Sequence, residues 1–250
     1  MDASPPVALS VLVPIYNEAG NILPLRDEVA AALDGVVAYE LLFVDDGSSD
    51  AGAAELEQAL AADRRVRVIR HARRSGKSAA LVTGFRAARA PWIQTLDGDR
   101  QNDPKDVVAL WRALHVPEPP ASLGLVAGQR KRRNDGAIKW LSSRIANAIR
   151  RFALGDGTPD TGCGFKLIRR DVAVGFPFFD GMHRFLPALT RRAGYEIMQY
   201  PVEDRPRAAG VSKYGFFGRL GAGTVDLLGV VWLMRRATPA SAREISRESA

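Results

Sequence analysis

Four short apolar runs in the N-terminal part of the chain constrain the fold most strongly. They are Leu9–Ile15 (LSVLVPI), Glu40–Val44 (ELLFV), Val66–Ile69 (VRVI) and Pro91–Leu96 (PWIQTL). Short, mainly apolar runs of this kind are typical of strands buried on both faces of a parallel sheet. Helical patterns lie between them, over Asn21–Leu33, Ala51–Leu60 and Ser78–Ala88. The alternation predicts an α/β fold with a doubly wound, mainly parallel sheet flanked by helices.

Polar clusters follow three of these runs. Residues 16–18 (YNE) follow the first, residues 45–48 (DDGS) end the second, and residues 97–99 (DGD) follow the fourth. Ligands of such sheets bind beyond the carboxyl ends of the strands. We therefore expect the three clusters to meet at one binding edge.

The stretch 97–103 (DGDRQND) places several carboxylates directly after an apolar run in a basic protein. Asp97 and Asp99 can chelate a hard divalent ion, because Mg²⁺ typically pairs one or two carboxylates with water and substrate phosphates. Gln101 is a plausible further ligand. An isolated match of this kind is more often a solvated acidic turn, so the metal interpretation depends on the position at the binding edge.

Two further motifs border the same edge. Asp45 or Asp46 can accept a hydrogen bond from the base or ribose of a nucleotide, although their stretch is also good turn chemistry. Residues 73–78 (RRSGKS) invite comparison with a Walker loop but lack its first glycine. Lys77 opens a predicted helix, where it can either meet a phosphate or serve a turn.

Charge and composition narrow the class of protein. A chain of 250 residues with 46% hydrophobic and 25% charged residues suits one globular domain. A net charge of +7 points to anionic partners such as nucleotides, nucleic acid or a membrane surface. The arginines lack interleaved aromatic residues, so we expect no nucleic-acid partner. The single cysteine, Cys163, excludes an internal disulfide, and the N-terminus lacks the features of a secretory signal, so we expect a cytoplasmic protein.

The second half of the chain has a looser pattern. It predicts a helix over 106–114, a strand over 123–127 and an amphipathic helix over 140–154. The last helix is expected to bury Leu141, Ile145, Ile149 and Phe152. Its exposed face is expected to carry Arg144, Arg150 and Arg151.

The segment Phe216–Met234 is mostly apolar and is predicted to form an amphipathic helix. Arg219 and Asp226 interrupt it, so a membrane-spanning helix is not expected. Such a helix can lie in the membrane interface, or pack against the domain or another subunit, which leaves a homo-oligomer open.

Seven motifs, in this order, carry a resemblance to a known family. They are VPIYNE (13–18), FVDDGSSD (43–50), GKSAALVTGF (76–85), QTLDGDRQNDP (94–104), GQRKRRND (128–135), DTGCGFKLIRRD (160–171) and RPRAAGVSKY (205–214). Together they resemble family 2 glycosyltransferases, and within them the dolichol-phosphate mannosyltransferase-like, or polyprenyl-phosphate glycosyltransferase, group. The resemblance implies a GT-A, Rossmann-like catalytic domain over 1–214, followed by the helical segment over 215–237 and a disordered tail over 238–250.

The resemblance also implies roles for individual residues. The donor would be bound by Pro14, Tyr16, Glu18, Asp45, Asp46, Lys77, Asp97, Gly98, Asp99, Arg207 and Lys213. A Mg²⁺ or Mn²⁺ ion would be held by Asp97, Asp99 and Gln101. The acceptor's phosphate would be received by Arg130, Lys139 and Ser143. The catalytic residues would be Asp97, Asp99 and Arg130, with Asp160 in reserve as a general base.

The implied reaction is an inverting transfer of a sugar from a GDP- or UDP-sugar to a polyprenyl phosphate of the undecaprenyl or dolichol type. A lipid monophosphate is already anionic and can attack without a general base. A peripheral enzyme at the inner face of the cytoplasmic membrane is expected. Two alternatives stay open: a GT-A enzyme that glycosylates a saccharide or other hydroxyl acceptor, and a basic nucleic-acid-binding module.

Overall fold

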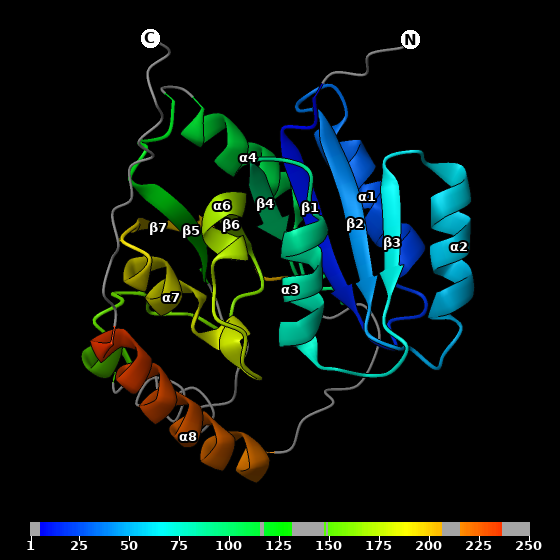
Figure 1. The fold of residues 1–250 in the computed structure, drawn as a ribbon. Helices are drawn as coiled ribbons and strands as arrows, with labels where there is room; N and C mark the ends of the chain where they lie inside the picture. The colour runs from blue at the N-terminus through cyan, green and yellow to red at the C-terminus, as the bar shows by residue number, and fades with distance from the viewer. Residues whose placement is uncertain (1–5, 116–117, 132–147, 149, 207–215, 237–250) are drawn as a thin grey trace, which may run out of the picture.

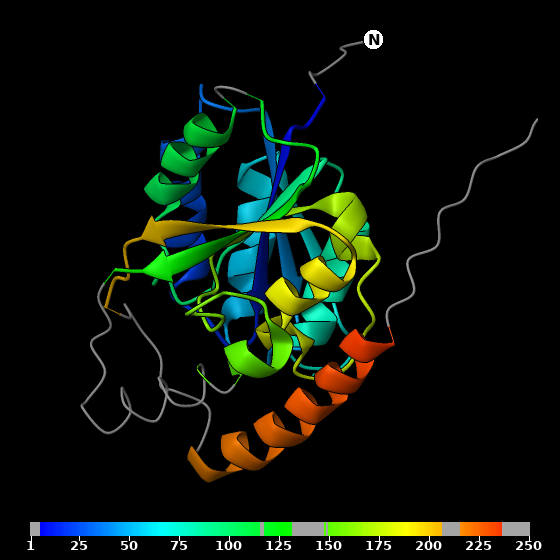
Figure 2. The same cartoon turned by 90° about the vertical axis from the view of Figure 1, so that its left-hand side faces the viewer.

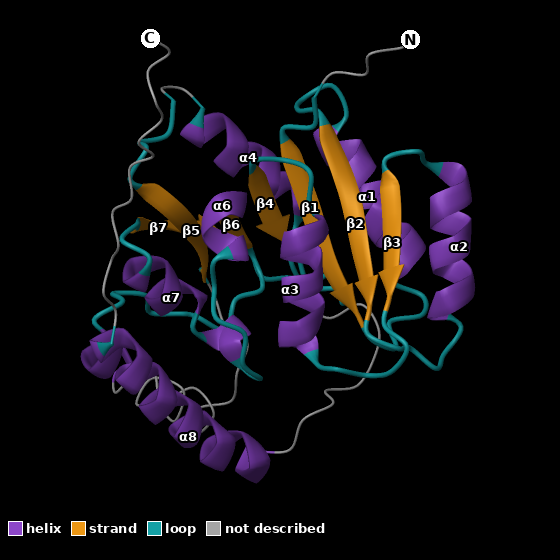
Figure 3. Ribbon diagram, viewed as in Figure 1, coloured by secondary structure: helices purple, strands orange, loops and turns teal. Residues whose placement is uncertain are grey.

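A seven-stranded sheet with helices on both faces forms the centre of the protein (Figures 1 and 3). The structure is a computed structural model that describes residues 6–115, 118–131, 148, 150–206 and 216–236. The strands are β1 (Leu9–Ile15), β2 (Tyr39–Asp45), β3 (Val66–Arg70), β4 (Trp92–Thr95), β5 (Leu123–Arg130), β6 (Lys166–Arg169) and β7 (Glu196–Val202). The helices are α1 (Ile22–Leu33), α2 (Gly52–Ala62), α3 (Lys77–Ala87), α4 (Pro104–Leu114), α6 (Arg170–Val174), α7 (Leu186–Arg192) and α8 (Phe216–Arg235), with a short 3₁₀ helix, η1 (Met182–Arg184).

The order of the strands is β3-β2-β1-β4-β6-β5-β7. Strands β3, β2, β1 and β4 run parallel, whereas β6 is antiparallel to both β4 and β5. The chain passes from β1 outward to β3 on one side and then returns to β4 on the other. This reversal creates a crevice beyond the ends of β1 and β4, the place where open α/β sheets bind ligands. The α/β class and the mainly parallel sheet predicted from the sequence are therefore confirmed.

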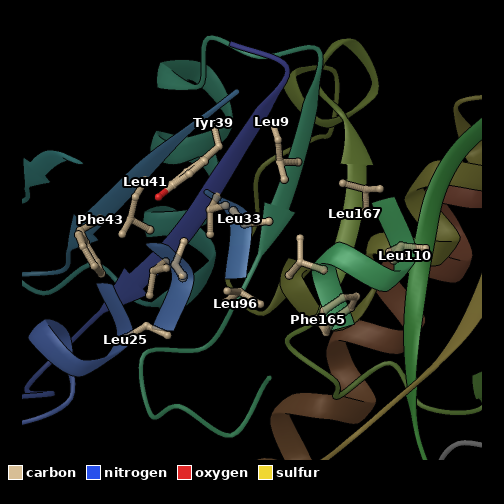
Figure 4. Close-up of a cluster of buried hydrophobic side chains, with 14 of the residues drawn as sticks. Leu9, Leu25, Leu33, Tyr39, Leu41, Phe43, Leu96, Leu110, Phe165 and Leu167 are labelled. Carbon is tan, nitrogen blue, oxygen red and sulfur yellow. The ribbon is translucent and has the colours of Figure 1, made fainter. Parts of the chain in front are cut away.

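The sheet is apolar on both faces because its strands alternate between two cores. Leu41 and Phe43 of β2 point into a core with α1, α2 and α4, part of which is drawn in Figure 4. Leu42 and Val44 point into the opposite core, with α3, α6 and α7. All four side chains are at most 2% exposed. Burial of this kind contributes roughly 1.5–3 kcal/mol for each large apolar side chain, and it fixes the register that sets the strand ends.

The predicted elements of the first half are observed with ends shifted by a few residues. Helix α4 begins at Pro104 because Asp103 caps it, its carboxylate accepting a hydrogen bond from Lys105 N at 2.9 Å. Five elements were not predicted, namely β6, α6, η1, α7 and β7. The first is only four residues long, and β7 alternates weakly between partly buried and exposed positions.

The prediction for the helix over 140–154 is wrong at two residues. Residues 148 and 150–154 are helical, and the rest of that segment lies outside the described residues. Arg150 is buried, because its guanidinium pairs with Asp156 and donates to the carbonyl of Thr158. Phe152, predicted to be buried, is 94% exposed. Hydrophobic periodicity cannot anticipate an arginine whose partner lies on the following loop.

Helix α8 lies beyond the edge of the sheet at which β1 and β2 end, as Figures 1 and 2 show together. Its Val230 packs with Leu154, Phe185 and Ala188 in a third, small core. Its Val225, Leu228 and Trp232 are exposed. No helix within the described ranges combines the length and the apolar character needed to cross a membrane.

Candidate active site

The loops after β1 and β4 touch at the crevice between these strands. Gly98 makes this approach possible: a Cβ placed on it would lie 2.7 Å from Cδ1 of Ile15 and 3.4 Å from the carbonyl oxygen of Pro14. The loop after β2 joins them, because Asn17 N donates to Ser48 Oγ at 2.9 Å. The structure therefore brings the three polar clusters together at one edge, as the sequence predicted.

The two aspartates that end β2 have different surroundings. Asp45 is fully buried and accepts hydrogen bonds from Ser48 N at 2.9 Å and from Arg70 Nε at 2.8 Å. Asp46 accepts from Ser75 N at 2.8 Å and Gly76 N at 2.7 Å, and its carboxylate lies 2.8 Å from Nδ1 of His71. Asp46 thus shapes the loop that leads into α3.

The acidic loop after β4 is held in a strained turn. Arg100 has a φ of +62°, unusual for a residue with a side chain, and its guanidinium pairs with Glu28 of α1. Asp97 N donates to Asn102 Oδ1 at 3.0 Å, and Gln101 N donates to Asp99 Oδ1 at 3.2 Å. These bonds fix the backbone from which the side chains of Asp97 and Asp99 project.

The ligand chemistry of this loop fits a divalent metal. Carboxylate and amide oxygens are the hard ligands that Mg²⁺ and Mn²⁺ prefer. The amide nitrogen of Gln101 donates to the carbonyl of Arg205 at 3.3 Å, which leaves its amide oxygen as the group that can ligate. Among the described residues, no three His, Cys, Asp or Glu side chains gather into a metal site. A metal held by Asp97, Asp99 and Gln101 therefore needs further oxygens from water or from a substrate's phosphates.

Two lysines lie beside Asp97. Lys77 Nζ is 2.5 Å from Asp97 Oδ1. Lys166 is buried, and its ammonium donates to the carbonyls of Thr161, at 3.2 Å, and Cys163. Both lysines and Asp97 line a small cavity of about 20 Å³, together with His183. A space of that size suits about one water molecule.

The pKa values in this cluster follow from burial and neighbouring charge. Burial would lower the pKa of Lys77 and raise that of Asp97, but their mutual attraction outweighs it, so the pKa of Lys77 is raised and that of Asp97 is lowered. Burial lowers the pKa of Lys166. Burial, together with Lys77, Arg184 and Lys166, lowers the pKa of His183 to about 3, so its imidazole is neutral at pH 7.

The loop 160–166 closes over Asp97 from the other side. A Cβ placed on Gly164 would lie only 2.3 Å from Cγ of Asp97, so any side chain there would displace the carboxylate. The carbonyl of Gly164 accepts a hydrogen bond from Thr95 Oγ1 at 2.5 Å. The motif DTGCGFK therefore packs directly against the acidic loop.

Arg130 and Asp160 form a two-pronged ion pair at the end of β5. Arg130 Nε lies 2.7 Å from Asp160 Oδ2, and Nη2 lies 3.1 Å from Oδ1. Burial alone would lower the pKa of Arg130. The hydrogen bonds and the charge of Asp160 outweigh this effect, so the pKa of Arg130 is raised above its usual value. Asp160 also accepts from Gly162 N at 3.2 Å. Asp160 thus holds Arg130 in a fixed orientation at the end of β5.

The segment 203–206 is tied to the acidic loop. Arg205 N donates to the carbonyl of Gln101 at 3.0 Å, and Asn102 forms a β-bridge with Asp204. The guanidinium of Arg205 pairs with both Glu28 and Asp103. Four of the predicted site residues, Lys139, Ser143, Arg207 and Lys213, lie outside the described residues.

Sequence reasoning missed two residues of the site, Glu28 and Lys166, and the contacts of a third, Arg205. Lys166 and Arg205 each stand inside a quoted motif, so their motifs were the available signal. Glu28 lies on α1 within an ordinary amphipathic pattern. Only the tertiary structure connects it with the acidic loop.

The order and directions of the strands are those of the GT-A fold of glycosyltransferases. Residues 10–175 match the model of "Glycosyl transferase family 2". The chain belongs to this family, which confirms the resemblance based on its motifs.

Among curated relatives, the chain is 36% identical to dodecaprenyl-phosphate galacturonate synthase of Rhizobium johnstonii, over 91% of this chain and 67% of that protein. It is 31% identical to undecaprenyl-phosphate 4-deoxy-4-formamido-L-arabinose transferase of Salmonella paratyphi A, over 86% of this chain and 65% of that protein. The chain thus spans about two thirds of the length of these relatives.

Solved structures with the same fold include glucosyl-3-phosphoglycerate synthase from Mycobacterium tuberculosis in complex with Mn²⁺, uridine diphosphate and phosphoglyceric acid. The TM-score is 0.68 at 21% identity, and the match covers 94% of this chain and 80% of that one. At this identity the likeness establishes the fold.

Proposed function

We propose that this glycosyltransferase moves a sugar from a nucleotide-diphosphate sugar to the phosphate of a polyprenyl phosphate, with inversion at the anomeric carbon. The observation that carries the proposal is the juxtaposition of Asp97 and Asp99 with the Arg130–Asp160 pair across the loop 160–166. One side offers ligands for a metal-bound diphosphate, and the other offers a fixed guanidinium for a second phosphate. The two curated relatives, whose names specify polyprenyl-phosphate acceptors, support this assignment.

On the donor side, the chain binds and orients the diphosphate. A divalent ion held by Asp97, Asp99 and Gln101 would stabilise the negative charge that develops on the departing diphosphate. Pro14, Tyr16 and Glu18 border the same crevice, where the nucleotide would lie. Arg70, held by the buried Asp45, presents its remaining guanidinium N–H groups at this edge. Arg207 and Lys213, which lie outside the described residues, would add positive charge for the diphosphate.

On the acceptor side, Arg130 would receive the incoming phosphate, with Lys139 and Ser143. A guanidinium held at two points by Asp160 loses little freedom when it binds an anion, which favours a phosphate over a neutral hydroxyl. Asp160 is committed to Arg130 through both carboxylate oxygens. This arrangement supports a positioning role for Asp160 rather than proton abstraction from a hydroxyl acceptor. The phosphate oxygen attacks the anomeric carbon as the sugar–diphosphate bond breaks.

We also propose that the enzyme binds the membrane surface peripherally, at the inner face of the cytoplasmic membrane, through α8. The exposed side chains Val225, Leu228 and Trp232 recur on one face of this helix. Arg236 lies over the ring of Trp232, with 5.5 Å between its Cζ and the ring centroid. An apolar face edged by arginines suits the interface of an anionic bilayer, in which the acceptor would reside.

The donor half of the proposal is tested by thermal unfolding with UDP, GDP and Mn²⁺. We expect one nucleotide to stabilise the protein strongly only when Mn²⁺ is present, because the diphosphate completes the metal's ligands. Asp99→Ala is expected to abolish the Mn²⁺-dependent part of the shift. Asp27→Ala, at a carboxylate that is 64% exposed on α1, is the matched control and should retain it. Retention of the Mn²⁺-dependent shift by Asp99→Ala would contradict the ligand assignment.

The acceptor half is tested by comparing turnover of a short-chain polyprenyl phosphate with turnover of a sugar alcohol, using the nucleotide sugar whose nucleotide binds. We expect transfer to the polyprenyl phosphate. Transfer to the sugar alcohol alone would replace the proposed acceptor with a hydroxyl.

A further inference from the structure

Four buried or partly buried charges gather behind the metal-binding loop. Asp97 and Asp99 supply two negative charges, and Lys77 and Lys166 supply two positive ones. Lys77 contacts Asp97 directly, at 2.5 Å. Lys166 of β6 pairs with Thr95 of β4, and Thr95 lies two residues before Asp97 in the sequence. Lys166 and Asp97 line the same cavity. Asp99 and Lys166 are 8% and 4% exposed.

The sum of these four charges is zero, two negative and two positive. A divalent cation added alone would leave a charge of +2 in a poorly hydrated site, which is costly. The diphosphate of a nucleotide sugar, added alone, would place about two negative charges beside Asp97 and Asp99, and free UDP or GDP up to about three, which is also costly. The cation and the diphosphate added together return the sum to about zero.

We propose that Lys77 and Lys166 balance the carboxylates of Asp97 and Asp99, so that a divalent cation and a diphosphate bind this site as one neutral unit. This inference rests on the proposed function for its diphosphate ligand. It gives the two lysines a role that is not ligation. The two lysines determine how much the bound nucleotide changes the affinity for the cation, and how much the bound cation changes the affinity for the nucleotide.

The two lysines differ in whether they move when ligands bind. The ammonium of Lys166 is held by the carbonyls of Thr161 and Cys163, so it stays in place when ligands bind. Lys77 is 34% exposed and bound to one oxygen of Asp97, so it can exchange Asp97 for a phosphate oxygen when a cation takes the carboxylate. Lys166 is therefore a positioning residue that acts through charge, and Lys77 also reaches the diphosphate.

The experiment measures binding of Mn²⁺ to the full chain by electron paramagnetic resonance, with and without UDP or GDP. The ratio of the two Mn²⁺ affinities is the coupling factor, and the nucleotide's affinity must change by the same factor when Mn²⁺ is added. In the wild type we expect weak Mn²⁺ binding alone and a large coupling factor. Lys166→Met removes one buried charge at similar volume. We expect it to tighten Mn²⁺ binding in the absence of nucleotide by about fivefold or more and to reduce the coupling factor by a similar amount.

Two other variants support this experiment, one as a replacement for Lys166→Met and one as a control. Lys77→Met, at a partly exposed side chain, is expected to change both quantities in the same direction and serves if Lys166→Met fails to fold. Lys105→Met, on the exposed start of α4, removes the same formal charge outside the site and should leave both quantities unchanged. Raising the salt concentration should leave the difference between Lys166→Met and the wild type in place, because buried charges are weakly screened.

The outcomes separate the inference from the proposed function. Unchanged or weaker Mn²⁺ binding in both Lys166→Met and Lys77→Met, each folded by circular dichroism, overturns the inference. Tighter Mn²⁺ binding in these variants, while neither UDP nor GDP binds any of the proteins, supports the charge balance and overturns the proposed nucleotide donor. Tighter Mn²⁺ binding with a reduced coupling factor supports both.

Discussion

At the scale of single residues, Asp97 can take its position only because residue 164 is a glycine. The carboxylate of Asp97 occupies the space that a Cβ at position 164 would need. A side chain held in place by backbone contact is pre-oriented before any ligand arrives. The same holds on the other side of the acidic loop, where Gly98 lies against Ile15.

We expect Gly164→Ala to weaken Mn²⁺-dependent nucleotide binding by about tenfold or more, because a displacement of about 1 Å at a reacting group is costly. Isothermal titration with UDP or GDP and Mn²⁺ measures the effect. Gly229→Ala, where a Cβ would meet nothing within 4 Å, is the matched control and should bind as the wild type does. Equal affinity of Gly164→Ala and the wild type would show that Asp97 does not need this position.

At the scale of secondary-structure elements, Glu40 joins three strands at the edge of the sheet opposite the site. Its carboxylate accepts hydrogen bonds from Ser10 Oγ at 2.6 Å, Arg67 Nη1 at 2.6 Å and Arg89 N at 2.7 Å. Burial would raise the pKa of Glu40, but these donors outweigh it and hold the pKa below its usual value of 4.5. The charged form therefore stabilises β1, β2 and β3 against one another.

We expect Glu40→Gln to lower the free energy of unfolding by about 1–3 kcal/mol at pH 7, since it weakens hydrogen bonds to buried donors. Because the pKa of Glu40 is lower in the folded protein, its contribution is present above the usual value of 4.5 and is lost as the pH falls through the folded pKa. The difference between the wild type and Glu40→Gln should therefore shrink in acid, as measured by urea unfolding at several pH values. Glu57→Gln, on the exposed side of α2, is the control. A difference that stays constant into acid would contradict this account.

The elements show what the sequence can and cannot foretell. Strands β1, β2 and β4 were predictable because burial on both faces favours a short, mainly apolar run, and the acidic loop followed from where β4 ends. Strand β6 was missed, although its motif was noticed, because four residues carry too little periodicity. The ion pairs Lys77–Asp97 and Arg205–Glu28 were not predictable, because each joins separate segments that only the packing of the sheet and helices brings together. The pair Arg150–Asp156 was missed because it depends on the path of the loop that follows Arg150.

At the scale of the whole molecule, the membrane contact proposed for α8 would give the enzyme an orientation. The helix packs through Val230 and presents Trp232 outward. Phe152, close in sequence to Leu154 of the same small core, is also exposed. The net charge of +7 adds a long-range attraction to anionic lipids.

We expect the protein to float with vesicles that contain anionic lipid, and Trp232→Glu to reduce the floating fraction severalfold, since it places a charge on the face that enters the interface. Binding of nucleotide with Mn²⁺ should be unchanged in this variant. Leu60→Glu, at a half-exposed leucine on α2, introduces the same charge elsewhere and is the control. Full flotation of Trp232→Glu would exclude α8 as the docking surface.

The cavity beneath Asp97 has a consequence for the choice of lipid. At about 20 Å³ it has space for a water molecule and not for an isoprene unit. In the proposed arrangement, with α8 on the bilayer, the tail of the acceptor would stay among its neighbouring lipids, and only the headgroup would reach Arg130. Enzyme and acceptor would then meet by diffusing in a plane. Polyprenols of different lengths should accordingly serve almost equally well, with the membrane and not the protein accommodating the difference.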